Sequence, residues 1–438
     1  MRIGSAVLTS VLYLLLSTGL FGQNSKLAPD LAALLNNPVT PGQQLNVIVQ
    51  LNPPGLLQSV TGLVGLLPGV NRLLYSLIPA VTQTLPVASI LSLANLPTVK
   101  YISLDRPVGA TLAAATDYSH AAIGANFAAS YGLTGDGIGV AILDSGISNH
   151  ADLAGRVVYR ESFVSSKSAD DYGHGSHVAG IVAGNGSASR SGVTGIAPGA
   201  KLIDLRVLDA NGMSSDSVII AALDRAVQLK SKYNIRVINL SVGRPVYESC
   251  KNDPLVQAVE AAWKQGIVVV VAAGNFGRNG YSTILSPGNS PLAITVGAMK
   301  TLDTQSTADD QIASYSSKGP TWGDLIVKPD IVAPGNLIMS LRTPGSTLDR
   351  TYPDSVVDGS YARLSGTSMA APMVSGAAAL MLQRTPGLSP DTVKARLMKT
   401  ASKSFPLASV TVDPTTRAVY PGAVRILSCF PINLSRRN

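Results

Sequence analysis

Two short runs of this 438-residue sequence carry side chains that could do nucleophilic chemistry. His174 lies in GHGSHVAG at 173–180, where a glycine on each side lets the backbone come close to a substrate and exposes the ring. Ser368 lies in GTSMAAP at 366–372, ahead of an apolar helix that could hold its hydroxyl rigidly and add a positive dipole end. Each residue also has a plain structural explanation, as a turn feature and as a helix cap.

Two further polar residues directly follow apolar runs. Asp144 comes after GVAIL at 139–143, and Asn275 ends VVVVAAGN at 268–275. A side-chain amide beside Ser368 could stabilise a developing oxyanion, whereas the plain alternative for Asn275 is a turn residue after a buried strand.

Alternating strand-like and helix-like segments must position these residues. Apolar runs typical of strands occur at 138–143, 202–207, 237–240, 267–272 and 294–296, and helical spacing occurs at 217–230 and 254–264. This alternation predicts an α/β fold with a doubly wound, mostly parallel sheet and helices on both faces. Because the carboxyl ends of parallel strands meet at one edge, Asp144 and Asn275 should lie at the same edge.

Four motifs, in order, resemble the signature blocks of the subtilisin-like serine peptidases, the subtilases. They are Asp144-Ser145-Gly146, the run around His174, Ala273-Gly274-Asn275 and the run around Ser368. The similarity extends from about Gly135 to Ala401. The sequence departs from the family pattern at Ser176, where Thr is usual, at Met373, where His is common, and over the tail 420–438.

The resemblance implies a serine endopeptidase that works through an acyl-enzyme. Ser368 would be the nucleophile, His174 the general base and Asp144 the group that holds the histidine tautomer. Asn275 and the Ser368 backbone N–H would bind the oxyanion. Two alternatives stay open: a non-catalytic binding protein on this scaffold, and an acyl transferase that passes the acyl group to an amine.

The resemblance also implies a groove for protein or peptide substrates. The residues expected to pair with an extended substrate, or to wall the pocket for the residue before the scissile bond, are Ser241, Val242, Gly243, Ala272, Ala273 and Gly274, with Gly212 on the opposite rim. Pairing through backbone groups predicts broad specificity. Small walls without a fixed charge predict a preference for large apolar side chains before the scissile bond.

The first 22 residues are typical of a signal peptide, because Arg2 precedes an apolar stretch and small residues follow it. The apolar stretch is too short to span a membrane, so we expect a secreted, extracellular product with no membrane association after signal removal.

Residues 23–115 resemble the family's α+β pro-domain, and 116–438 would be the peptidase domain. Within the pro-domain we expect strands at 45–51 and 99–104 and a helix at 85–95. It would assist folding and act as an intramolecular inhibitor until self-cleavage near 108–118 makes the zymogen active. The alternative is a permanent domain without a regulatory role.

Composition narrows the remaining partners and ligands. Charged residues make up 14% of the chain and the formal charge is +8, but no run of five or six basic residues occurs, so we expect no nucleic-acid binding. We expect a monomer and no cofactor for the chemistry, while metal ligands and a structural calcium stay undecided. A disulfide between Cys250 and Cys429 is equally undecided.

Overall fold

The computed structural model describes residues 26–35, 43–52, 73–110, 125–165, 169–190, 192–302, 304, 309–403, 410–412 and 419–421. The chain divides into two compact units: the first comprises residues up to Leu73 together with Pro79–Leu104, and the second comprises Leu74–Ile78 and the chain from Asp105 onward. The predicted signal peptide at 1–22 and Cys429 lie outside the described residues.

The first unit is built on a four-stranded sheet, in which β1 pairs antiparallel with β3 and with β4, and on two helices. Its strands, in the order β2-β3-β1-β4, are β1 (Gln44–Leu51), β2 (Leu73–Leu74), β3 (Ala80–Pro86) and β4 (Val99–Leu104), and its helices are α2 (Pro29–Leu35) and α4 (Val87–Ala94). The predicted strands at 45–51 and 99–104 are confirmed as β1 and β4. The predicted helix at 85–95 is α4, which begins after Pro86 because Pro86 is still extended.

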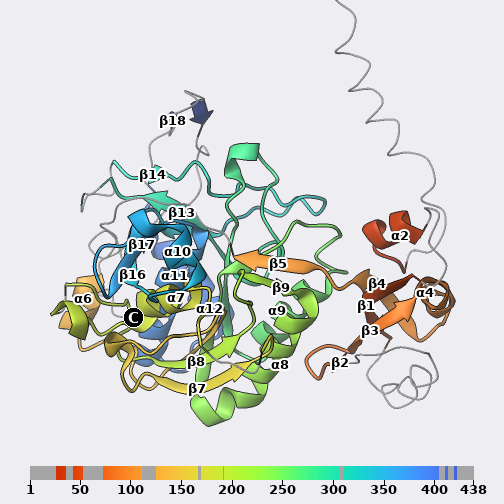
Figure 1. Cartoon of the computed structure of the whole chain (residues 1–438), viewed down its shortest axis with the longest axis horizontal. Coiled ribbons are helices and arrows are strands. Elements are labelled where there is room, and N and C mark those ends of the chain that lie inside the picture. Colours follow the sequence, from red (N-terminus) through yellow and green to blue (C-terminus); the bar gives the residue numbers. More distant parts are fainter. Residues whose placement is uncertain are drawn as a thin grey trace, which may run out of the picture. The chain divides into compact units, whose positions relative to one another are not determined.

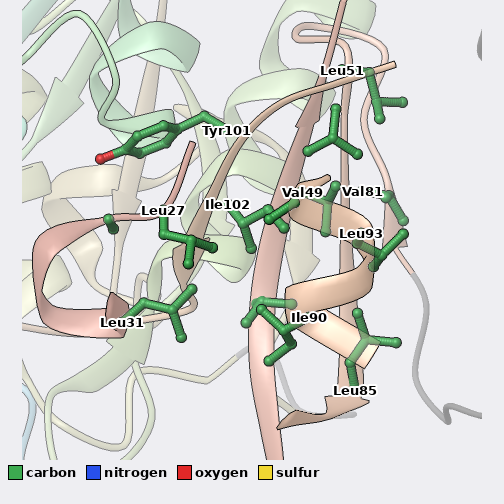
Figure 2. Packing of buried hydrophobic residues seen from close by; sticks show 14 residues of the cluster. Leu27, Leu31, Val49, Leu51, Val81, Leu85, Ile90, Leu93, Tyr101 and Ile102 are labelled. Carbon is green, nitrogen blue, oxygen red and sulfur yellow. The ribbon is translucent and has the colours of Figure 1, made fainter. Parts of the chain in front are cut away.

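This unit has a hydrophobic core of its own. Figure 2 shows side chains from α2, α4 and the strands gathered around Val49 and Ile102, both almost fully buried. Full burial of one such side chain contributes about 1.5–3 kcal/mol relative to exposure. A contiguous core of this kind lets the unit hold its fold from local contacts.

The second unit is built on an eight-stranded sheet in the order β14-β13-β12-β10-β6-β8-β7, with β15 also paired to β13 (Figure 1). The strands are β6 (Gly139–Asp144), β7 (Val157–Ser162), β8 (Lys201–Arg206), β10 (Ile235–Leu240), β12 (Val268–Ala272), β13 (Ile294–Lys300), β14 (Gln311–Ile312) and β15 (Ile331–Pro334). All pairs are parallel except β13 with β14. Every residue of β6 and β12 is buried, as expected for parallel strands covered on both faces.

Helices cover both faces of this sheet and make it a doubly wound α/β fold. They are α6 (Ala125–Ser130), α7 (His174–Ala183), α8 (Asp216–Tyr233), α9 (Pro254–Lys264), α10 (Thr347–Thr351), α11 (Thr367–Arg384) and α12 (Pro390–Thr400). Helix α7 packs against α11, and α8 packs against α9. Short 3-10 turns lie at Ala151–Leu153, Ser187–Ser189, Gly277–Asn279 and Pro353–Ser355.

Three small sheets complete the described part of the second unit. They are β11-β5-β9, made of Val242–Gly243, Pro107–Ala110 and Met213–Ser215; β16 (Ile338–Leu341) with β17 (Tyr361–Leu364); and β18 (Val410–Val412) with β19 (Val419–Pro421). Because β5 belongs to this unit, the compact first unit ends at Leu104, before the expected domain boundary at 115. Among the described residues, we find no helix with the length and hydropathy needed to cross a membrane.

Candidate active site

His174 is the first residue of α7, and close packing explains both of its flanking glycines. Gly173 has a positive φ of 96°, which disfavours residues with a Cβ, and a side chain there would also clash with Ser346. A side chain at Gly175 would clash with the carbonyl of Gly146. The sequence suggested that these glycines expose the ring to substrate, but the structure shows that Gly175 lets the start of α7 lie against the loop after β6, and that Gly173 lets it lie against Ser346.

The imidazole of His174 is held by Asp144. The distance from Nδ1 to Asp144 Oδ1 is 2.7 Å, and both side chains are fully buried. The same Oδ1 accepts a 2.8 Å hydrogen bond from the backbone N–H of Ser145. Among the described residues, His174 Nε2 has no hydrogen-bond partner. The pair therefore leaves one ring nitrogen available for proton transfer.

A second carboxylate, Asp170, organises the backbone around this pair, and the sequence reasoning missed it. One oxygen accepts from Ser145 Oγ and Gly173 N, both at 2.7 Å. The other accepts from Ser176 N at 2.8 Å and from Ser176 Oγ at 2.6 Å. Burial raises the pKa of Asp170, and these hydrogen bonds oppose that rise. The sequence feature that could have identified Asp170 is its position, four residues before His174.

Ser368 lies in the first turn of α11, and a proline inside this helix explains one of its contacts. Pro372 has no N–H, so the carbonyl of Ser368 lacks its usual helical partner. Ser241 Oγ supplies that hydrogen bond at 2.9 Å, and Ser368 Oγ donates in return to the carbonyl of Ser241 at 3.0 Å. The two serines are therefore locked together where β10 ends.

The register of the sheet brings this serine pair to the edge that holds the histidine. Leu240 and Leu143 are paired on the neighbouring parallel strands β10 and β6, so Ser241 and Asp144 follow them side by side. The predicted placement of Asp144 and Asn275 at one edge agrees with the parallel pairing of β6, β10 and β12, and the contacts of Ser241 bring Ser368 to the same edge.

Asn275 follows β12 and contacts the residue before Ser368. Its Oδ1 accepts from the backbone N–H of Thr367 at 3.0 Å and from Thr367 Oγ1 at 3.1 Å. Because a backbone N–H can only donate, these contacts fix which side of the amide is oxygen. The Nδ2 group is buried and has no partner among the described residues. An unused donor beside a helix N-terminus can stabilise negative charge.

Two of the expected groove glycines pack against Leu285. A Cβ atom at Gly243 would lie 3.0 Å from Leu285 Cβ, and one at Gly274 would lie 2.6 Å from Leu285 Cγ. Ala273, at the end of the same wall, accepts a 3.0 Å hydrogen bond from Leu285 N through its carbonyl, and Ala272 ends β12. Leu285 therefore fills the space between the walls made by 241–243 and 272–274, which the sequence did not suggest.

The chain's own strand β5 runs between the expected substrate segment and the expected opposite rim. Gly243 and Val242 pair antiparallel with Gly109 and Ala110, and β9 pairs with β5 on its other side. Gly212 precedes β9, and a side chain there would overlap the ring of Tyr172. β5 is thus paired between the backbone edges of β11 and β9, and Figure 1 shows β5 beside β9.

Within the described residues, no group of three or more His, Cys, Asp or Glu side chains is arranged to hold a metal ion. Cys250 is buried and unpaired, and burial raises the pKa of its thiol to about 12. The disulfide with Cys429 stays a prediction.

Comparison of this chain with known proteins shows the family to which it belongs. A model of the subtilase family matches residues 135–420. The chain belongs to the subtilase family. Subtilases are serine endopeptidases, so the chain is a subtilisin-like serine endopeptidase.

Several relatives agree with this assignment. The chain is 42% identical to the serine protease AprX of Bacillus subtilis over 71% of each chain, and 38% identical to subtilisin DY of Bacillus licheniformis over 62% of this chain and 86% of that protein. Among solved structures, it resembles the S41 psychrophilic protease with a TM-score of 0.51 and 33% identity, covering 61% of this chain and 84% of that one.

The structure of fervidolysin from Fervidobacterium pennivorans, a keratinolytic enzyme related to subtilisin, supports the fold alone. The TM-score is 0.64 at 23% identity, over 83% of this chain. The match covers 59% of fervidolysin, so this chain spans less than two thirds of that protein's length.

Proposed function

We propose that this subtilase hydrolyses peptide bonds through an acyl-enzyme formed on Ser368, with His174 as general base, Asp144 as its orienting carboxylate and Asn275 as an oxyanion donor. The observation that carries the proposal is the fully buried 2.7 Å contact between His174 Nδ1 and Asp144 Oδ1, at the sheet edge that also holds Ser368. Such a pair presents a neutral imidazole whose other nitrogen can accept a proton.

The reaction starts with rotation of the Ser368 hydroxyl from the carbonyl of Ser241 toward His174 Nε2. Its proton moves to Nε2 while Oγ bonds to the substrate carbonyl carbon, whose oxygen becomes negative. When this intermediate collapses, the C–N bond breaks and the leaving amine takes the proton from Nε2. Water then attacks the ester by the same proton transfers. Asp144 stays ionised throughout and stabilises the imidazolium.

The negative oxygen is stabilised by donors that need no rearrangement. Asn275 Nδ2 is buried and unused, and its orientation is fixed by the two hydrogen bonds from Thr367 to Oδ1. The backbone N–H of Ser368 and the positive end of α11 add to this field. Preorganised donors of this kind stabilise the transition state more than the ground state.

The test compares Ser368→Ala with a serine substitution in the same helix. Ser375 donates to Asn239 Oδ1 at 2.8 Å and has no part in the proposed chemistry, so Ser375→Ala is the matched control. We expect Ser368→Ala to lose casein cleavage and labelling by a fluorophosphonate probe, and Ser375→Ala to keep both. Wild-type cleavage by purified Ser368→Ala would refute the proposal.

The chain is made as a zymogen that cuts itself after β5. The support is that β5 occupies the position of an extended substrate between β11 and β9. In this register Ala110 pairs with Val242. The next residue of a substrate bound in the same way would lie opposite Ser241. The carbonyl of Ser241 accepts a hydrogen bond from Ser368 Oγ, so this next residue lies beside the nucleophile. We therefore place the cut between Thr111 and Leu112, which narrows the predicted range 108–118.

Mass spectrometry tests the processing step. Wild-type protein should yield a new N-terminus at Leu112, and full-length Ser368→Ala should stay uncut. Catalytic amounts of wild-type enzyme added to Ser368→Ala should then produce the Leu112 terminus. A Ser368→Ala chain that is processed on its own would mean that another protease makes the cut.

The pocket for the residue before the scissile bond accepts an apolar or small side chain. Its walls carry no charge, and Leu285 lies so close that a Cβ atom at Gly243 or at Gly274 would come within 3.0 Å of it. The sequence favoured a large apolar side chain, but Leu285 limits the depth, so we propose residues of the size of Thr, Val or Leu. Thr111 before the proposed cut fits this size.

The enzyme is exported and acts outside the cell as a monomer. This part of the proposal rests on the charge and hydrophobic pattern of residues 1–22. Recovery of activity from washed cells but not from the medium would contradict it, and size-exclusion chromatography with light scattering tests the oligomeric state.

A further inference from the structure

Arg106, the residue immediately before β5, is bound in a buried acidic site of the second unit. Its guanidinium forms an ion pair and hydrogen bond with Glu248, and the exposed fractions of the two side chains are 3% and 1%. The guanidinium carbon also lies 5.2 Å from the centre of the Tyr247 ring. A carboxylate and an aromatic face together are a recognition site for a guanidinium group.

The backbone of Arg106 is held as part of the strand in the groove. Its carbonyl accepts a 2.8 Å hydrogen bond from Asp216 N, and Asp105 Oδ1 accepts one of the same length from Ser217 N. Pro107, the next residue, is already paired with Ser215 in β9. Arg106 thus extends the segment that occupies the place of a substrate.

The surrounding charges favour a cation at this position. Arg244 is already saturated, because it contacts Asp216 twice at 2.8 Å and Asp253 once at 2.9 Å. Asp216 and Asp253 are ion-paired with Arg244, whereas the ion pair of Glu248 is with Arg106. A segment that leaves the groove therefore exposes an acidic site that a basic substrate side chain can neutralise.

We infer that Glu248 and Tyr247 form a specificity subsite for an arginine or lysine at the sixth position before the scissile bond of a protein substrate. The inference rests on the proposed function and deepens it. If the residue opposite Ser241 is the first before the scissile bond, the β5 register makes Arg106 the sixth. Arginine should bind better than lysine because its planar guanidinium matches both the carboxylate and the ring.

The experiment measures kcat/KM of the processed wild-type enzyme on four quenched fluorescent peptides based on residues 105–116. The first has the natural sequence with Arg at position 106. The second and third have Ala or Glu there, and the fourth exchanges Arg106 and Pro107, which turns the basic side chain to the other face of the strand. Casein cleavage is measured in parallel as the test of the proposed function.

We expect the natural peptide to be cleaved roughly 10- to 100-fold faster than the Ala peptide, since a hydrogen bond to a charged group in a binding site gives that range. The Glu and exchanged peptides should be no better than the Ala peptide. The preference should shrink as salt is raised, because the subsite opens to solvent when the groove is empty.

Variants then assign the preference to Glu248. Glu248→Gln should bring the Arg peptide close to the Ala peptide, and Glu248→Arg should make the Glu peptide the best substrate. The matched control is Glu161→Gln, because Glu161 forms a 2.7 Å ion pair with Arg225 on the far edge of the sheet. If the Glu248 variants do not accumulate, the wild-type peptide series alone decides the question.

The outcomes separate failure of the subsite from failure of the proposed function. Equal rates on the Arg and Ala peptides, casein cleavage without cleavage of any peptide, or an Arg preference that survives Glu248→Gln would overturn the subsite while leaving the endopeptidase intact. Loss of all cleavage, casein included, by the wild-type protein would refute the proposed function itself.

Discussion

Replacing Asp170 should show that the active-site backbone depends on one buried carboxylate. Asp170 accepts four hydrogen bonds from Ser145, Gly173 and Ser176, two on each oxygen. In Asp170→Asn the new amide group faces one of these donor pairs, so two charge-assisted hydrogen bonds are lost. At about 1.5–3 kcal/mol each, the expected loss of stability is about 3–6 kcal/mol.

This loss corresponds to a melting temperature lower by about 4–8 °C for a unit of this size. Scanning calorimetry at one scan rate, in the Ser368→Ala background to prevent autolysis, measures it. The control is Asp354→Asn, because Asp354 is exposed and the loss of its charge should matter little. A difference below about 2 °C between the two variants would refute the role assigned to Asp170.

Three further predictions follow from the site. Asn275→Ala should lower kcat about 100- to 1000-fold with little change in KM, the size of effect known for the oxyanion amide of subtilisin, while exposed Asn279→Ala should not; equal kcat values would remove Asn275 from the proposal. Burial raises the pKa of Asp204 from 3.8 to about 8, so only the folded state binds this proton between those pH values, and stability should fall as pH rises across them. Urea denaturation of Ser368→Ala at pH 5 and pH 8 measures the fall, and Asp204→Asn should flatten it. Leu285→Gly should raise kcat/KM for Phe relative to Thr before the scissile bond by about tenfold or more, and an unchanged ratio would show that Leu285 does not set the pocket depth.

The central part of the fold was predictable because buried parallel strands are continuous apolar runs. The runs at 138–143 and 267–272 became β6 and β12, in which every residue is buried. β7 was missed because its residues are all partly exposed, so it has neither a continuous apolar run nor a clear alternation. β5 and β9 were missed for a different reason: they are short strands whose partners lie far away in the sequence.

The site was predictable only as far as motifs mark it. Asp144 and Ser368 are placed by the ends of secondary-structure elements, which the sequence shows. Asp170 could not be assigned from the sequence, because its role depends on hydrogen bonds to the backbone of a folded loop. Leu285 could not be assigned either, because its place in the pocket depends on contacts with two glycines that are distant in sequence. Arg106 and Glu248 are separated by 142 positions, and neither lies in a motif.

In the proposed zymogen, substrate selectivity and the release of β5 from the groove are physically linked. β5 satisfies backbone groups of both β11 and β9, and a substrate strand would do the same whatever its sequence, so backbone pairing alone gives affinity without selectivity. In our proposal, selectivity comes from side-chain sites at the two ends of the groove, at Leu285 and at Glu248. Because Arg106 is ion-paired with Glu248, any change that strengthens this contact should also slow departure of the segment that we propose is cut. Arg106→Ala should therefore speed the appearance of casein activity after cleavage, without changing the rate of casein cleavage by the mature enzyme. If activity appears after the same delay in the wild type and in Arg106→Ala, the ion pair does not control release.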